Sequence, residues 1–420
     1  MMARVNTTEV TCPAGTVLGV MDDGLRRFHS IPVVQASGLF DNPRPAELGL
    51  LIDATRPRPN APHLSITAPA ATAHEDLPVM VWIHGGRFEE GDHTETFSNP
   101  DGFAREGVVH VRVGYRLKFP GFVQFPDDTA AHYRAVADVS TALTWIQHNI
   151  EAFGGDPTNV TVMGHSAGAA IALWLCRRDH YKGEFRRVLA MSPAFPRRGF
   201  PQRKWAARGA LGTPIARVAL NRLSPTKLNH AYQRFRLHFP TDMALGPYPL
   251  EPQEMANVPV VLTCTDKEFH HSGAKLDRVP ALGRVFVRVA GRTMGLRKRA
   301  SKGAGKGTVT GTGKGYTAGQ LLSDSLVRRH VDAVAEHAPG PVWLAEHVGY
   351  AHAEDLSGMF APDPWLLTFL RTGDVGWPEY GVSGRGAVRR REAEAPTVVH
   401  DPLGYLRDIF EDPNRSDIAE

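Results

Sequence analysis

The segment NVTVMGHSAGAAI, residues 159–171, limits most narrowly how this chain can fold. Its β-branched start is typical of a buried strand, and its alanine-rich end is typical of a helix. Between them lies Ser166, two residues from Gly164 and from Gly168. A serine there could be a turn residue, a helix N-cap or a nucleophile. In so sharp a turn, side chains at the two glycines would collide with neighbouring backbone, and Ser166 would project above the sheet.

Six short apolar runs rich in Val, Leu and Ile recur along the chain. They lack strict alternation of polar and apolar residues, as is typical of strands covered on both faces. The runs occupy residues 77–86, 107–116, 159–166, 185–193, 258–268 and 341–350. The early residues 10–23 instead predict a small antiparallel hairpin at the edge of the sheet.

A strong helical pattern lies between the second and third of these runs. Its apolar residues step by three and four positions and so share one side of a helix: Val136, Val139, Leu143, Ile146, Ile150 and Phe153. The sequence FGGD then ends the helix with a glycine. Strand, helix and strand at this spacing predict a right-handed parallel crossover, and therefore a doubly wound, mostly parallel α/β sheet.

The composition is that of a globular protein with little excess charge. The 420 residues are 42% hydrophobic and 22% charged, with a formal net charge of +4, which does not indicate nucleic-acid binding. No apolar run approaches the ~18 residues of a membrane span, and there is no apolar leader. The three cysteines, Cys12, Cys176 and Cys264, match no disulfide or metal-site pattern. We expect a soluble cytoplasmic protein with no membrane or nucleic-acid partner.

We expect a single catalytic domain over residues 1–410 and a tail at 411–420. Two internal regions interrupt the alternation of strands and helices. Residues 194–250 are basic and helical in pattern, with Ser224 as an N-cap, and are expected to form a reduced cap around the substrate pocket. Residues 292–315 are rich in glycine and lysine without an apolar period, which predicts a flexible basic loop.

Glycines and polar side chains follow four of the predicted strands. The first strand ends in WIHGGRF, whose glycines would let backbone N–H groups converge on an oxyanion. Ser166 follows the third strand, Asp266 and Glu268 follow the fifth, and His347 and His352 follow the last. Open α/β sheets place their sites at these strand ends. The chain order serine, acid, histidine is that of α/β-hydrolases, and the convergence predicts an enzyme.

On these motifs the sequence resembles the type-B carboxylesterase family, relatives of the cholinesterases with the α/β-hydrolase fold. The blocks in family order are LPVMVWIHGGRFEEGD, GYRLKFPGF, NIEAFGGDPTNVTVMGHSAGA, TDKEF, GYAHAEDL and WPEY, and the likeness extends over roughly residues 10–405. The resemblance implies that fold and the hydrolysis of small-molecule carboxylic esters.

The same resemblance implies roles for individual residues. Ser166 would be the nucleophile, His352 the general base and Glu268 the triad acid, with Asp266 as the runner-up acid. The implied oxyanion hole consists of the backbone N–H groups of Gly86, Arg87 and Ala167. An acyl group on Ser166 would be released by water, without a metal or an organic cofactor.

The sequence departs from the family pattern near the expected site. His165 replaces the glutamate that usually precedes the nucleophile, and Ala169 replaces a glycine. Arg87 replaces a small residue, so its side chain is expected to crowd or charge the pocket and to favour acidic or polar acyl groups. The chain is also shorter than most members, with the missing length near residues 192–250, so the substrate class cannot be carried over.

Two other classes of function are alternatives. The fold family includes adhesion proteins that have lost the nucleophile, so a catalytically silent binding protein is one of them; such proteins have a broken triad, whereas all three residue types are present here. The basic residues of 292–315 could contact nucleic acid non-specifically, but GTGKGYT lacks the spacing of a P-loop. A solvated loop is the simpler interpretation.

Overall fold

The computed structural model describes residues 6–47, 49, 51–59, 62–70, 76–129, 131–297, 316–361, 363–381, 384–391 and 394–411. The strands of its main sheet are β1 (Thr7–Cys12), β2 (Gly15–Asp22), β3 (Leu25–Pro32), β6 (Leu51–Asp53), β7 (His63–Pro69), β8 (Leu77–Ile83), β9 (Val109–Val113), β10 (Gly155–His165), β11 (Arg187–Met191), β12 (Val260–Lys267), β13 (Val342–Ala351), β14 (Gly386–Arg390) and β15 (Thr397–His400). Strands β4 (Val34–Gln35) and β5 (Arg44–Pro45) form a separate pair.

The helices of the described residues are α1 (Pro100–Arg105), α2 (Lys118–Phe122), α3 (Arg134–Asn149), α4 (Ala167–Leu175), α5 (Phe200–Leu211), α6 (Arg217–Asn221), α7 (Pro225–Arg236), α8 (His270–Asp277), α9 (Pro280–Thr293), α11 (Ala318–Ser323), α12 (Arg329–His337), α13 (Leu356–Phe360), α14 (Pro364–Thr372) and α15 (Tyr405–Ile409). Short 3-10 helices cover Ile150–Phe153 and Pro252–Glu254, and one π-helical turn covers Asp324–Arg328.

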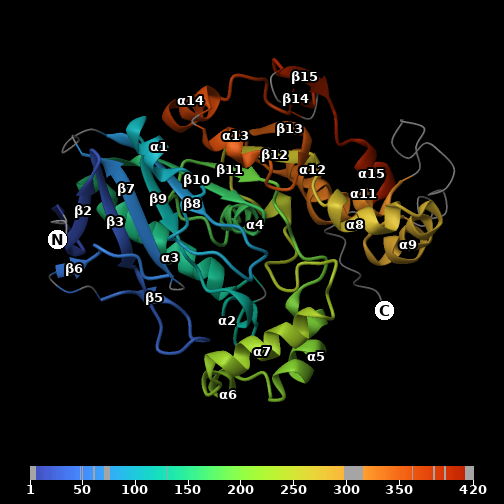
Figure 1. Cartoon of the computed structure of the whole chain (residues 1–420), viewed down its shortest axis with the longest axis horizontal. Helices are drawn as coiled ribbons and strands as arrows, with labels where there is room; N and C mark the ends of the chain where they lie inside the picture. Colours follow the sequence, from blue (N-terminus) through green and yellow to red (C-terminus); the bar gives the residue numbers. More distant parts are fainter. Residues whose placement is uncertain are drawn as a thin grey trace.

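The main sheet runs in the order β1-β2-β3-β7-β9-β8-β10-β11-β12-β13-β14-β15, with β6 beside β2 (Figure 1). The strands from β9 to β14 in this order pair in parallel. Antiparallel strands flank them on both sides, from β1 to β7 and at β15. The six apolar runs form β8 to β13, and the early residues 10–23 fall in the β1–β2 hairpin, as predicted.

Both faces of the parallel strands are covered by helices, which explains why their sequences do not alternate. Val79 and Val81 of β8 belong to a cluster that includes apolar residues of α3 and α4. Met80 and Trp82 of the same strand belong to a second cluster with residues of α1, α13 and α14. Successive side chains of a strand point to opposite faces, so each residue of β8 is buried under one of the two helix layers.

The predicted crossover helix is α3, which leads from β9 to β10. It ends at Asn149, and the chain continues for one 3-10 turn to Phe153, so the last two apolar positions of the pattern lie beyond the α-helix. Gly154 follows with φ of 90°, a left-handed conformation that favours glycine. The predicted glycine stop is therefore confirmed.

The predicted cap region contains helices α5, α6 and α7, grouped at one end of the molecule in Figure 1. Ser224 is the N-cap of α7 and accepts a hydrogen bond from the N–H of Lys227 at 3.3 Å, as expected. The predicted basic loop does not begin at residue 292, because Arg292 and Thr293 are still the last residues of α9. Residues 298–315 of that loop and 412–420 of the predicted tail lie outside the described residues.

No helix in the described ranges is long and apolar enough to cross a membrane. The three cysteines are buried and unpaired.

Candidate active site

Ser166 occupies a strained turn between β10 and α4. Its φ and ψ are 55° and −115°, a conformation that a non-glycine residue rarely adopts. The two flanking glycines leave no room for side chains: a Cβ on Gly164 would lie 2.5 Å from the carbonyl carbon of Gly168, and one on Gly168 would lie 2.1 Å from the carbonyl oxygen of Ile83. The predicted collision with backbone is confirmed, because β10, α4 and the end of β8 meet without side chains between them.

The loop after β8 lies directly against this turn. A Cβ on Gly85 would be 3.0 Å from the carbonyl oxygen of His165 and 3.5 Å from the Cβ of Ser166. Its position is fixed from behind by Tyr115, whose hydroxyl donates to the carbonyl oxygen of His84 at 3.0 Å and whose ring stacks on His84 at 4.3 Å. The glycine-rich loop and the serine turn, separated by about eighty residues of sequence, therefore form one local structure.

Three successive residues of this loop have positive φ: 95° at Gly86, 59° at Arg87 and 64° at Phe88. A Cβ on Gly86 would lie only 2.2 Å from the carbonyl oxygen of Glu90. Within the described parts of the chain, no acceptor is bonded to the backbone N–H groups of Gly86, Arg87 and Ala167. Donors that are left free beside a serine hydroxyl are the arrangement that an oxyanion requires.

A buried Glu268 and a partly buried His352 form a pair at the ends of β12 and β13. Glu268 Oε2 lies 2.5 Å from His352 Nδ1. The other oxygen, Oε1, accepts hydrogen bonds from the Ser192 hydroxyl at 2.7 Å and from the Thr265 N–H at 2.8 Å. Burial by itself raises the pKa of Glu268, but His352 and these two donors outweigh burial and hold the pKa below its usual value. Glu268 is therefore a fully buried, ionised carboxylate with both oxygens bonded.

The ring of His352 contacts two other rings. Its centroid lies 4.5 Å from that of His165 and 4.5 Å from that of Phe269. His165 precedes Ser166, so this contact brings His352 to the serine turn. No hydrogen bond joins Ser166 and His352 among the described residues. Such bonds are often long or poorly aligned in a free enzyme and shorten when substrate binds.

The alternative acid and the alternative histidine, Asp266 and His347, form other hydrogen bonds. Asp266, the runner-up acid, accepts a hydrogen bond from the N–H of Gly349 at 2.8 Å, whereas the Nδ1 of His352 is bonded to Glu268. His347 pairs instead with Asp355, through Nδ1 at 2.6 Å. Of the two acids and the two histidines left open by the sequence, Glu268 and His352 are the pair joined by a hydrogen bond among the described residues.

Burial gives His165 an uncharged ring. It lowers the pKa of His165 well below the usual value, and the nearby His352 lowers it further. The position where the family has a glutamate is therefore neutral near pH 7, and Glu268 supplies the carboxylate that contacts His352.

The side chain of Arg87 is one-third exposed and is directed toward the segment that carries Asp242. Its Nη2 donates to the carbonyl oxygen of Asp242 at 2.8 Å, and its Nε lies 4.0 Å from a Glu89 oxygen. A backbone carbonyl does not neutralise the charge, and Glu89 is bonded more closely by Arg236, at 2.8 Å. Arg87 therefore carries its positive charge on the loop after β8, and its effect on the pocket stays a prediction.

Ser192 was not anticipated from the sequence. It follows β11, has φ of 46°, and orients Glu268 through its hydroxyl. The sequence did contain the relevant signal, because a polar residue directly after a buried strand was the criterion that singled out Glu268. Its role was not readable, since a serine followed by a proline after a strand is equally typical of a turn.

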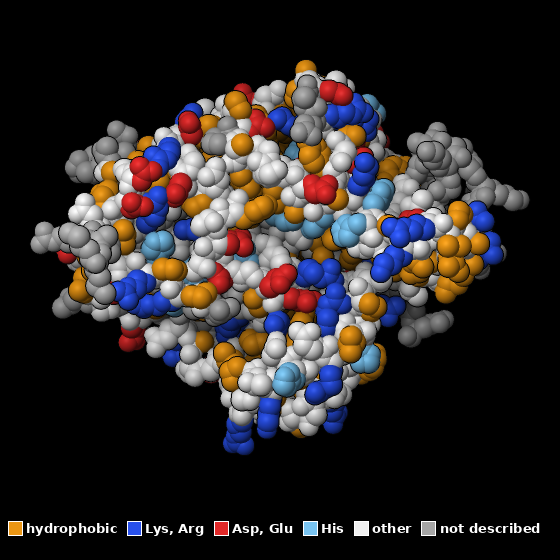
Figure 2. Space-filling model, viewed as in Figure 1, with side chains coloured by type: hydrophobic (Ala, Val, Ile, Leu, Met, Phe, Trp, Pro, Cys, Tyr) orange, Lys and Arg blue, Asp and Glu red, His pale blue; other side chains and the backbone are white. Residues whose placement is uncertain are grey.

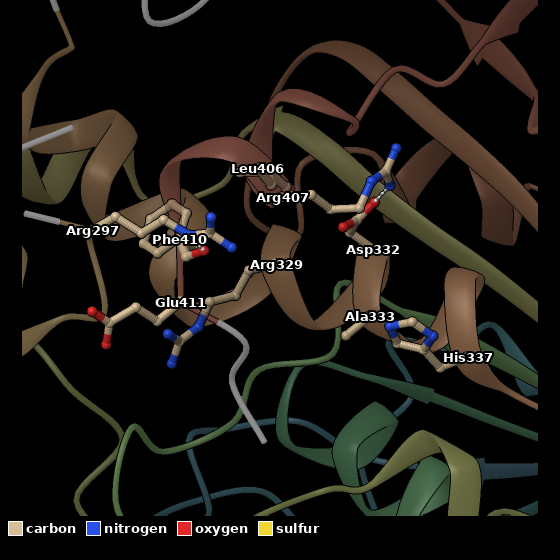
Figure 3. Close-up of a pocket in the computed structure, with 9 residues that line it drawn as sticks. All are labelled: Arg297, Arg329, Asp332, Ala333, His337, Leu406, Arg407, Phe410 and Glu411. Atoms are coloured by element: carbon tan, nitrogen blue, oxygen red, sulfur yellow. Dashed lines mark hydrogen bonds and ion pairs between the residues drawn. The ribbon is translucent and has the colours of Figure 1, made fainter. Parts of the chain in front are cut away.

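One acidic cluster distant from this site has the spacing of metal ligands. Asp332, Glu336 and Asp401 have carboxylate oxygens within 4.8 Å of one another, the one such group in the part of the chain that the structure describes. Arg407 donates to Asp332 and Asp401 and lies 3.1 Å from Glu336. Figure 3 shows Arg407 beside Asp332 at the wall of a cavity of about 120 Å³. The guanidinium thus fills the position that a cation would take.

Known proteins resemble this chain both in sequence and in structure. Residues 60–211 match the family described as "Carboxylesterase family". The chain is 32% identical to a para-nitrobenzyl esterase of Bacillus subtilis over 213 residues, which are 44% of this chain and 43% of that protein. It is 42% identical to carboxylesterase 5A of Canis lupus familiaris over 131 residues, which are 31% and 23% of the two chains.

Among solved structures, a carboxylesterase of Geobacillus stearothermophilus is similar over 96% of this chain and 100% of that one, with a TM-score of 0.79 and 22% identity. The predicted α/β-hydrolase fold is confirmed by this likeness. The family match and the relatives support the type-B carboxylesterase family, as the motifs predict. The matched segments span less than half the length of these curated relatives.

Proposed function

We propose that this chain is a carboxylic ester hydrolase that acts on small-molecule esters through an acyl-enzyme on Ser166. The observation that carries the proposal is the packing of the proposed oxyanion loop against the serine turn, where a Cβ added to Gly85 would lie only 3.5 Å from the Cβ of Ser166. Unbonded N–H groups beside a serine in a sharp strand-to-helix turn are the arrangement that acyl transfer uses. The names of the related esterases support the same reaction class.

In this mechanism His352 acts as the general base. Its Nδ1 faces the ionised Glu268, so the proton of a neutral ring resides on Nδ1 and leaves Nε2 free to accept a proton. As Ser166 Oγ attacks the ester carbonyl carbon, Nε2 takes the hydroxyl proton. The imidazolium that forms is stabilised by Glu268 and then protonates the departing alkoxide, so an alcohol leaves and the acyl group stays on Ser166.

The tetrahedral intermediate places negative charge on the former carbonyl oxygen. The N–H groups of Gly86, Arg87 and Ala167 are the donors proposed for that oxygen, and the N-terminus of α4 adds a favourable dipole. Water, deprotonated by Nε2, then attacks the acyl carbon, the bond from that carbon to Ser166 Oγ breaks, and the imidazolium returns its proton to Oγ as the acid leaves. The reaction needs no group besides these residues and water.

The decisive test is turnover of p-nitrophenyl esters of increasing acyl length by the wild type and by Ser166→Ala. Loss of a nucleophile typically lowers kcat by on the order of 10⁴-fold or more. A fluorophosphonate should add one covalent group per wild-type chain, as seen by mass spectrometry, and none to Ser166→Ala. The matched control is Ser140→Ala, a serine on α3 whose hydroxyl bonds only Lys182 among the described residues. Turnover that survives in Ser166→Ala would refute the proposal.

A further inference from the structure

Helix α9 is apolar on two opposite sides. On the inner side Val287 is fully buried, together with Gly283 and Gly291, which lie one turn before and after it. A Cβ on Gly291 would be 2.6 Å from a side-chain carbon of Leu296, and one on Gly283 would be 3.0 Å from Asp277 Oδ1. The inner side therefore packs closely on the rest of the molecule and fixes the orientation of the helix.

The outer side of α9 carries a stripe of large apolar residues in contact with solvent. Leu282, Val285 and Val289 are 53%, 58% and 70% exposed, and Val279, just before the helix, is 47% exposed. Positions 282, 285 and 289 are spaced by three and four residues, so they form one line on the side opposite Val287. Single exposed apolar residues are ordinary, whereas a continuous stripe on one helix is typical of an interaction surface.

Arginines border this stripe, and none of them has an ion-pair partner in the part of the chain that the structure describes. The exposed side chains of Arg278, Arg284, Arg288 and Arg292 form no ion pair within the described residues. The helix has no acidic residue, and none occurs in the sequence from residue 278 to residue 315. Figure 2 shows the hydrophobic side chains of α9 gathered on one shoulder of the molecule beside Lys and Arg side chains.

We propose that α9 docks on an anionic phospholipid surface. Its apolar stripe would enter the boundary between headgroups and acyl chains, and its arginines would contact lipid phosphates. A helix that lies in the plane of a membrane has this combination of an apolar stripe and basic flanks. The expectation of no membrane partner rested on the absence of a spanning segment, and a helix bound in the interface needs none.

A second copy of the chain fits this surface less well. A symmetric dimer through α9 would bring the same stripe, and the same arginines, from both copies to one interface. Like charges placed together cost affinity and have no acidic partner on either helix. An anionic lipid surface instead supplies the negative charge that the four arginines lack, which is why the proposal names lipid as the occupant.

The test is cosedimentation of the full chain with vesicles. We expect the partition coefficient to be at least about tenfold higher for phosphatidylcholine vesicles containing about one-third phosphatidylglycerol than for phosphatidylcholine alone, and to fall as salt is added. The combined variant Leu282→Gln/Val285→Gln/Val289→Gln and the variant Arg284→Gln/Arg288→Gln/Arg292→Gln should each lose most of this binding. All these side chains are exposed, so both variants should keep the thermal midpoint of the wild type.

The matched control replaces exposed residues elsewhere, Val218→Gln together with Arg208→Gln and Arg222→Gln, and should bind like the wild type. Equal binding to neutral and anionic vesicles, or equal loss in the control, would overturn the proposal. Sedimentation velocity without lipid provides a further check: a wild-type dimer that the Leu282 variant dissociates would assign the stripe to a second copy and overturn the lipid proposal. Hydrolysis of a water-soluble ester is measured separately, so this inference and the proposed function can fail independently.

Discussion

Glu268 and His352 are joined twice. The carboxylate of Glu268 lies 2.5 Å from Nδ1 of the imidazole, and the N–H of His352 donates to the carbonyl oxygen of Glu268 at 3.0 Å. The backbone bond fixes where the loop after β13 crosses the end of β12, and the side-chain bond fixes the ring. The orientation of the proposed base is therefore set by two independent contacts to one residue.

Glu268→Gln tests the side-chain contact. The amide has the shape of the carboxylate but cannot stabilise an imidazolium, so kcat should fall by about 10²- to 10⁴-fold with little change in KM. Asp266→Asn is the matched control, since Asp266 bonds Gly349 rather than His352, and it should keep kcat within about threefold of the wild type. Steady-state kinetics on a p-nitrophenyl ester measures both; equal losses in the two variants would contradict the assignment of the acid.

Ser192→Ala tests the support of the buried carboxylate. Removing one donor from Glu268 Oε1 should lower the free energy of unfolding by about 1–3 kcal/mol at pH 7. The folded-state pKa of Glu268 lies below its usual value of 4.5, so the stability that it contributes is present above that value and is lost as the pH falls through the folded pKa. The destabilisation should therefore shrink in acid. Urea unfolding at a series of pH values measures it, and a pH-independent cost would contradict this origin.

Gly168→Ala tests the packing of the serine turn. The added methyl group would lie 2.1 Å from the Ile83 carbonyl oxygen, which neither strand nor helix can relieve without moving. We expect a loss of about 3 kcal/mol or more in the free energy of unfolding. Gly209→Ala is the control: nothing lies within 4 Å of its Cβ position in α5, so it should be neutral or stabilising by up to about 1 kcal/mol. Similar effects of both substitutions on chemical unfolding would show that the turn is less tightly packed than the geometry indicates.

His110→Phe tests how much stability is lost at low pH because a neutral histidine is buried in strand β9. Burial lowers the pKa of His110 to about 3, so in the folded chain it stays neutral while the unfolded chain takes up a proton below about 6.5. The wild type therefore loses stability as the pH falls through that value, and the phenylalanine variant lacks this loss. Between pH 7 and pH 5 the difference in free energy of unfolding should shift by about 2 kcal/mol in favour of the variant.

This comparison uses the difference between two proteins because other groups act in the opposite sense. Burial raises the pKa of Asp332 to about 7, and that carboxyl group favours folding as the pH falls. Its effect cancels between wild type and His110→Phe. A difference that does not change with pH would mean that His110 is not buried as a neutral ring.

Arg87→Ala tests the charge at the oxyanion loop. The wild type should hydrolyse a p-nitrophenyl ester with a terminal carboxylate faster than the neutral ester of equal length, by about fivefold in kcat/KM, since one partly exposed charge contributes about 1 kcal/mol. The preference should disappear in Arg87→Ala and be retained in Arg87→Lys. Equal turnover of both esters by the wild type, unchanged in the alanine variant, would refute the role of the charge.

The sequence by itself determined the elements and their order. Residues 159–171 predicted a strand, a turn and a helix, because a β-branched run, a glycine-flanked serine and an alanine-rich run each have a local preference. The same holds for the six strands and for the glycine stop after α3, where periodicity and a left-handed φ are properties of a few adjacent residues. The segment 298–315, predicted as part of a loop, lies outside the described residues.

Only the tertiary structure decided which of the candidate residues meet. Asp266 and Glu268 lie two residues apart at the end of one strand, and His347 and His352 are equally close in sequence, so local pattern could not separate them. Their contacts depend on the register of β12 and β13 and on Ser192, which reaches Glu268 from a third strand. The exposed apolar stripe on α9 could not be predicted from the sequence either, because the same periodicity predicts a buried face. Only the packing of the helix shows which of its sides is covered.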